Sequence, residues 1–113
     1  MTANTTATKK SKRSRSKKFE KLVGPTDPRV DHDARERLTM ARIGLLLKQP
    51  FFGNLATRLK LVNADEWLTT AATDGRHFYY NSRFVMMLRV KEVEFLVGHE
   101  VLHVVYEIGR AHV

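Results

Sequence analysis

Cysteine is absent from this chain of 113 residues. Its absence excludes a disulfide-stapled fold and a metal site built from thiolates, so any metal must be held by histidine and carboxylate side chains. No apolar run approaches the length that a bilayer requires, and residues 1–21 contain no apolar core of a secretory signal. We therefore expect a cytoplasmic protein, and the length allows one small domain.

Positive charge is concentrated at the N-terminal end of the chain. Residues 1–22 hold eight Lys and Arg against one acidic residue, Glu20, whereas the remaining residues hold twelve Lys and Arg against eleven acidic residues. The basic segment is rich in Ser, Thr and Ala and has no apolar periodicity, a composition that predicts disorder. Two interpretations of this tail stay open: a solvating segment, or an arm that contacts nucleic-acid phosphates without sequence preference.

A turn-rich stretch, residues 24–28, follows the tail. We therefore place a disordered tail and linker at residues 1–28 and one domain at residues 29–106. Apolar residues then recur with helical spacing until Pro50, which predicts a helix over residues 32–48. The apolar residues of that helix are Ala34, Leu38, Ala41 and Leu45.

Strand signals come after the helix. Leucines alternate with basic residues over 58–61, which predicts a first strand. Two β-compatible runs, residues 67–73 and 76–80, flank an Asp-Gly dipeptide at 74–75. This arrangement predicts a hairpin in which both turn residues adopt positive φ.

Aromatic residues are expected mostly in the core. Residues 51–54, Phe-Phe-Gly-Asn, predict an apolar elbow, and both phenylalanines and Trp67 are interpreted as core side chains. Tyr79 or Tyr80 could steady a developing oxyanion, but packing is the preferred role for both. Asn81 suits the N-cap of a further short helix.

The last predicted helix, residues 90–106, is apolar over more than half of its circumference, which predicts burial on most sides. Within it lie His99, Glu100 and His103, an HExxH pattern. Histidines four residues apart share one helix face, so both imidazoles can reach one tetrahedral metal ion, with Zn²⁺ as the default. Glu100 lies beside such a metal, where it can act as the catalytic base toward a bound water.

The pattern leaves two points open. The histidines could instead be structural, partly buried and bonded to backbone or carboxylate groups. A catalytic zinc site also needs a third protein ligand. The metzincin continuation would place a histidine where Gly109 stands, and Glu107 and His112 are weak candidates.

Over residues 34–106 the chain resembles a family of predicted metallopeptidases of bacteria and phages, in which a zincin-like domain precedes a von Willebrand A-like domain. The resemblance implies a zincin-like α+β fold, zinc held by His99 and His103, and Glu100 as catalytic base. It also implies that the hairpin lies along the cleft, where a peptide substrate can add as a strand. The matching stretches are PFFGNLA (50–56), TAATDGRHFYYN (70–81) and HEVLH (99–103).

Members of the resembled family continue beyond the motif helix, into a region expected to supply the third ligand. Here residues 107–113 read Glu-Ile-Gly-Arg-Ala-His-Val. A common sequencing adapter, AGATCGGAAGAGCACACGTCTGA, preceded by one G, translates to the same seven residues and then a stop codon. We therefore expect residues 107–113 to be non-native and the chain to be an N-terminal fragment, inactive by itself.

The sequence thus favours an α+β fragment of a zinc-dependent metallopeptidase that acts on a peptide or protein substrate, without membrane association. Two alternatives from other classes stay open. One is a nucleic-acid-binding module that uses the basic tail and carries a degenerate HExxH helix. The other is a peptidase-like scaffold that binds a partner through its hairpin edge without cutting it.

Overall fold

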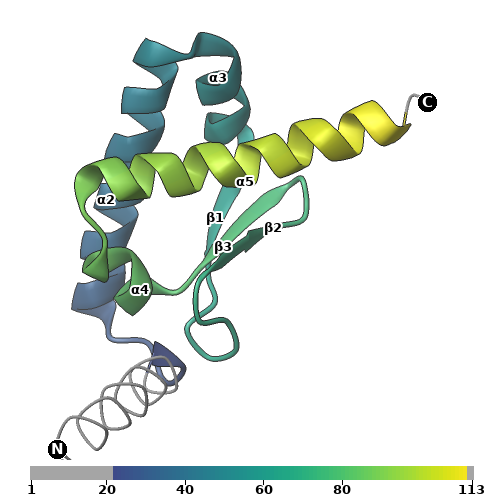
Figure 1. Cartoon of the computed structure of the whole chain (residues 1–113). Coiled ribbons are helices and arrows are strands. Elements are labelled where there is room, and N and C mark those ends of the chain that lie inside the picture. Colours follow the sequence, from purple (N-terminus) through teal and green to yellow (C-terminus); the bar gives the residue numbers. More distant parts are fainter. Residues whose placement is uncertain (1–21, 112–113) are drawn as a thin grey trace, which may run out of the picture.

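The computed structural model describes residues 22–111. Residues 1–21 of the predicted disordered tail and linker (1–28), together with residues 112 and 113, lie outside the described part. The described chain is α+β, as the sequence predicts, with helices packed on one another and a small mixed sheet beside them (Figure 1). In chain order, the elements are α2 (Pro28–Lys48), α3 (Pro50–Arg58), β1 (Lys60–Asn63), β2 (Ala71–Thr73), β3 (His77–Tyr80), α4 (Ser82–Met87) and α5 (Val90–Ala111).

The sheet has the strand order β1-β3-β2, with β3 in the middle. β1 runs parallel to β3, and β2 runs antiparallel to it, with Ala71 opposite Tyr80. Phe78 and Tyr80 are buried, while the alternate residues of β3 are partly exposed, so one face of this strand packs into the core. Helix α5 crosses α2 and then runs beside the hairpin of β2 and β3 (Figure 1).

Helix α2 begins at Pro28, earlier than the apolar periodicity predicts. The Asp27 side chain accepts a hydrogen bond from the backbone N–H of Arg29 at 2.9 Å. Proline is favoured at the first helical position because its fixed φ suits the helix and its missing N–H has no partner there. The buried stripe of this helix is the predicted one, Ala34, Leu38, Ala41 and Leu45.

The predicted elbow after Pro50 is wrong, because this stretch forms helix α3. Proline ends α2 and also occupies the first turn of α3, where it is tolerated. Gly53 lets the two helices approach closely, since a Cβ built there would lie 2.1 Å from Leu46 Cα. At the far end of α3, the guanidinium of Arg42 donates a hydrogen bond to the Leu59 carbonyl at 3.1 Å. Helix α3 is therefore held against α2 at both its middle and its end.

The hairpin of β2 and β3 is confirmed, but its turn differs from the prediction. Gly75 has a φ of 92°, whereas no described non-glycine residue has a positive φ, so Asp74 does not adopt the predicted conformation. The Asp74 carboxylate instead accepts hydrogen bonds from the backbone N–H groups of Arg76 at 2.9 Å and His77 at 2.7 Å. The Tyr79 hydroxyl donates a third hydrogen bond to the same carboxylate. Together, these hydrogen bonds hold the pKa of Asp74 well below its usual range.

Two aromatic side chains that the sequence assigns to the core lie on the surface. Trp67 is 62% exposed and Phe51 is 65% exposed, so both predictions are wrong. Phe52 is partly buried against the core, as expected. Trp67 lies in a turn before β2 rather than in a strand, and its ring packs edge-on against Tyr79 with centroids 5.6 Å apart.

Helix α5 is buried along one stripe and not on most sides, so that prediction is also wrong. Apolar content does not reveal which face a neighbour covers, and Phe95, Leu102 and Tyr106 are largely exposed. The buried stripe consists of Val93, Val97, Val101 and Val104. Among residues 22–111, no helix combines the length and the apolar character that a membrane crossing requires.

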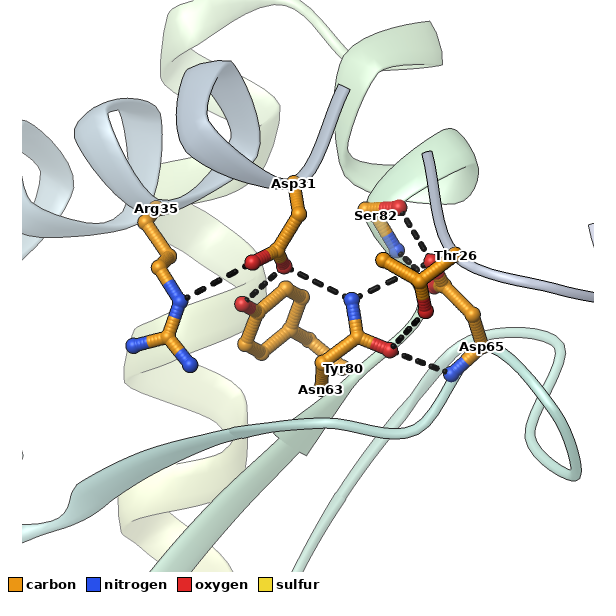
Figure 2. Close-up of polar contacts among 7 residues, drawn as sticks. All are labelled: Thr26, Asp31, Arg35, Asn63, Asp65, Tyr80 and Ser82. Carbon is orange, nitrogen blue, oxygen red and sulfur yellow. Dashed lines mark hydrogen bonds and ion pairs between the residues drawn. The ribbon is translucent and has the colours of Figure 1, made fainter. Parts of the chain in front are cut away.

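A polar network joins the start of α2 to the sheet (Figure 2). Asp31 on α2 accepts hydrogen bonds from the Tyr80 hydroxyl at 2.5 Å and from the Asn63 side-chain amide at 2.6 Å. It also pairs with Arg35 at 3.2 Å. Burial raises the pKa of Asp31, but these three hydrogen bonds outweigh that effect and lower the pKa below its ordinary value.

Asp65 is the second carboxylate of this network and is fully buried. It accepts hydrogen bonds from the backbone N–H and the hydroxyl of Ser82, both at 2.6 Å, and from Asn63 at 3.1 Å. Ser82 is the first residue of α4, where a negative charge meets unpaired N–H groups. The side chain of Asn81 caps the same helix, as predicted, by accepting a backbone N–H at 2.9 Å. The network thereby joins α2, the sheet and α4.

Replacing Gly53 with Ala is expected to lower the free energy of unfolding by about 1–3 kcal/mol, because the new methyl group would force α3 away from α2. Urea denaturation measures the change. Gly24→Ala is the matched control, since its Cβ would meet no atom within 4 Å, and its change should stay within about 0.5 kcal/mol. Equal stability of the two variants would contradict the close packing of α3 on α2.

Replacing Tyr80 with Phe is expected to lower the free energy of unfolding by about 1.5–3 kcal/mol at pH 7, because Asp31 loses a hydrogen bond to its charged form. The pKa of Asp31 is lowered by folding. The corresponding stabilisation is therefore present above the unfolded pKa of about 3.9 and is lost as pH falls through the lower folded pKa. Denaturation of both proteins from pH 7 to pH 3 should show their difference shrinking below about pH 4. A difference that stays constant over this range would contradict the account.

Candidate metal centre

The buried valine stripe of α5 sets the direction of the motif side chains. At 100° per residue, Glu100 lies about 60° from Val97 around the helix axis. On the same side, His103 and His99 lie about 120° and 160° from that valine. Glu100 is accordingly half-buried, whereas both histidines are exposed. The motif therefore projects from the margin of the core toward open space.

The two imidazole rings converge on one point. Nε2 of His99 and Nε2 of His103 are 3.1 Å apart, and the ring planes are at 88° with centroids 4.7 Å apart. Two imidazole nitrogens on a tetrahedral ion, with metal–nitrogen bonds of 2.0–2.1 Å, lie about 3.3–3.4 Å apart. The observed spacing therefore fits one shared ion. Structural histidines would bond to backbone or carboxylate groups. Within the described part of the chain, neither of these two rings does so.

Glu100 is the third member of the group. One candidate ligand atom from each of His99, Glu100 and His103 lies within 4.8 Å of the others. Burial raises the pKa of Glu100, and the two neighbouring histidines offset this only in part. A carboxyl group with a raised pKa, adjacent to converging imidazoles, can accept a proton and return it.

Phe95 lies beside the first imidazole. It lies one helical turn before His99, and the two rings stack with planes 18° apart and centroids 6.3 Å apart. Both side chains are exposed, so Phe95 forms part of the surface around the first imidazole. The sequence analysis did not assign Phe95 to the site, although the four-residue spacing is the signal that could have revealed it.

Hollows lie on both sides of the motif, and a further one of about 400 Å³ is also lined by His99. The hairpin cleft, of about 640 Å³, lies between β2 with its turn, residues 71–75, and the side of α5 that carries Glu100 and His103. The apolar pocket, of about 570 Å³, lies on the other side of the motif and has His99 in its wall. The converging nitrogens thus lie between a cleft bounded by the edge strand of the sheet and a pocket formed by helices.

The tyrosines of the hairpin have partners away from the motif. Tyr80 is buried and bonds to Asp31, while the Tyr79 hydroxyl donates to Asp74 at 2.9 Å. The bond to Asp74 raises the pKa of Tyr79. The burial of Tyr80 agrees with the packing role that the sequence favours, and both hydroxyls bond to carboxylates outside the HExxH pattern.

A second group of possible ligands lies near the start of α2. His32, Asp33 and Glu36 are all exposed, with candidate ligand atoms within 4.8 Å of one another. The sequence analysis did not single out this group, although His32 and Glu36 are four residues apart. Such exposed acidic groups are common without a metal. The HExxH group differs because it alone, among the described residues, brings two imidazoles together.

The donors of the HExxH group fit a metal ion with open positions. The two imidazole nitrogens would supply two ligands of a tetrahedral ion, so solvent, a substrate or a further protein ligand would supply the others. Glu107 does not belong to the group of donors within 4.8 Å, and His112 lies outside the described residues. The third protein ligand therefore stays a prediction.

Comparison with known proteins gives one match. A family model described as "Putative metallopeptidase domain" matches residues 33–109. The matched region runs from helix α2 through most of α5 and includes the whole HExxH group. None of the curated proteins or solved structures compared with the chain matches it.

Replacing His99 or His103 with Ala is expected to weaken Co²⁺ binding at least roughly tenfold, because each change removes one of two converging nitrogens. Titration of the visible absorption bands of Co²⁺ measures the affinity. His32→Ala is the matched control, since it removes an imidazole from the other candidate group. Weaker binding in the control, with unchanged binding in the His99 and His103 variants, would place the metal elsewhere.

Proposed function

This chain belongs to the family described as putative metallopeptidase domains, and from that membership we propose that it forms the zinc-binding part of an enzyme that hydrolyses peptide bonds. The observation that carries the proposal is the 3.1 Å approach of the His99 and His103 Nε2 atoms. The fold supports the proposal by placing the motif helix beside a small sheet that has β2 as an edge strand.

Zinc is the ion that this donor set favours. Imidazole nitrogen binds Zn²⁺ well, and tetrahedral geometry agrees with the spacing of the two Nε2 atoms. When bound, zinc polarises a substrate carbonyl and lowers the pKa of a water molecule toward neutrality. His99 and His103 would hold the ion, and both side chains are exposed, so a substrate could approach them.

Glu100 moves the proton. As the water oxygen bonds to the carbonyl carbon, one water proton passes to the Glu100 carboxylate. The same proton then passes to the amide nitrogen as the carbon–nitrogen bond breaks, which gives an amine and a carboxylic acid; the acid then loses the second water proton to solvent. The position of Glu100 beside the two histidines supports both transfers, because the carboxylate lies within reach of the place where the water would be held.

The substrate backbone pairs with the edge strand. β2 pairs only with β3 among the described strands, so its other side has main-chain groups without strand partners. The same strand lines the hairpin cleft opposite Glu100 and His103. An extended peptide added to β2 would therefore lie in the hairpin cleft, beside Glu100 and His103.

Replacing Glu100 with Gln is expected to retain zinc and to lower the rate of peptide hydrolysis by roughly 10²–10⁴-fold, since an amide cannot take the proton of the attacking water. The rate is best measured in a family member that carries the same three residues and continues beyond the motif helix. Metal analysis of both proteins should give about one zinc per chain, and His99→Ala should lose it.

Each of the other possible outcomes would contradict part of the proposed function. Wild-type affinity for a partner in Glu100→Gln, with no turnover by either protein, would make the domain a binding scaffold. Folding without zinc, together with DNA binding that weakens steeply with salt, would favour a nucleic-acid-binding module. Full hydrolysis by Glu100→Gln would refute the assignment of the base.

A further inference from the structure

The apolar pocket beside His99 is not needed to hold the metal or to move the proton. It lies where the end of α2, helix α3 and the first half of α5 meet, and its volume of about 570 Å³ is in the range of small-ligand sites. Its walls are mainly apolar, with charged groups at the rim. The residues that form the walls are Leu45, Phe52, Phe95, Gly98, His99 and Leu102.

Gly98 hollows out this pocket. Glycine in the interior of a helix costs about 0.5–1 kcal/mol relative to alanine, so its presence there calls for a reason. Close packing is not the reason, because the nearest atom to a built Cβ is Leu45 Cδ1 at 3.9 Å, an ordinary contact. Gly53 shows the contrast, since its Cβ would overlap the α2 backbone. At position 98, the missing side chain leaves space in the pocket directly beside His99.

The rim of the pocket is polar and held in place. Lys48 at the end of α2 pairs with Glu94 on α5, with 2.8 Å between Nζ and Oε1. Gly44 allows this arrangement, because a Cβ there would lie 2.9 Å from the Glu94 carboxylate. Lys91 adds a second positive charge at the same rim. A ligand side chain bound in the pocket would therefore contact apolar walls. The charged groups at the entrance would lie near the polar backbone of the ligand.

We propose that this pocket is the specificity pocket of the peptidase and takes one large aliphatic or aromatic side chain of the substrate, next to the bond that is cut. The inference rests on the proposed function. His103 lines the hairpin cleft beside β2, and His99, on the other side of the motif, lines the apolar pocket. A substrate side chain that points past the metal would enter the apolar pocket.

Two hydroxamates test the pocket in the zinc-loaded chain, one with an isobutyl side group and one with a methyl group. Calorimetry should give at least roughly tenfold tighter binding for the isobutyl compound, the order expected when three more carbons are buried. Gly98→Leu should abolish that preference, because the new side chain fills the pocket, while zinc affinity is retained. Gly24→Leu is the matched control and should keep the preference, since a Cβ at Gly24 meets open space.

A second measurement does not need the metal. In the metal-free chain, millimolar N-acetyl-leucine amide should shift the NMR signals of Leu45, Phe95 and Gly98, whereas N-acetyl-alanine amide should not. Gly98→Leu, shown by circular dichroism to fold, should lose the shifts. If the signals shift only in the pocket and the chain binds no zinc, the pocket is a binding site for a large side chain, and the proposed peptidase function is refuted.

Zinc binding without any preference between the two hydroxamates, and without shifts in the pocket, would overturn the specificity pocket and leave the proposed function standing. A third outcome concerns a different occupant. If the chain dimerises with increasing concentration and Gly98→Leu keeps it monomeric in sedimentation experiments, a second copy fills the pocket and the proposal is wrong.

Discussion

The burial of one valine stripe on α5 is the constraint on which the rest of the site depends. This helix cannot rotate about its axis without exposing the stripe, so its place in the core also fixes the direction of His99 and His103. Their Nε2 atoms then meet at 3.1 Å on a regular helix, with Phe95 stacked on one ring. Core packing and the geometry of the candidate metal centre therefore come from the same interaction.

The polar network fixes the position of the sheet, as the valine stripe fixes the position of α5. Asp31 and Asp65 collect hydrogen bonds from the ends of β1 and β3 and from the start of α4, which gives the sheet one position relative to α2 (Figure 2). Helix α5 packs on the same α2. The edge strand and the motif helix thus have a common support, and the hairpin cleft between them is preorganised by residues that do not line it.

Much of the fold is predictable because its signals are local. The hairpin at Gly75 and the cap at Asn81 each depend on neighbours within a few residues, and the structure confirms both. Helix α3 and the exposure of Trp67 are not predictable in this way, because they depend on which surfaces meet, as at Gly53. The candidate site is also predictable only in part. The HExxH spacing predicts converging imidazoles, whereas the hairpin cleft, the apolar pocket and the half-burial of Glu100 arise from tertiary packing.

Anomalous X-ray diffraction at the zinc absorption edge, from crystals of the zinc-loaded chain, tests the central claim most directly. The account predicts one peak about 2.0–2.1 Å from Nε2 of both His99 and His103. A peak at His32 and Glu36 instead, or imidazole rings that point apart with no peak between them, would contradict it.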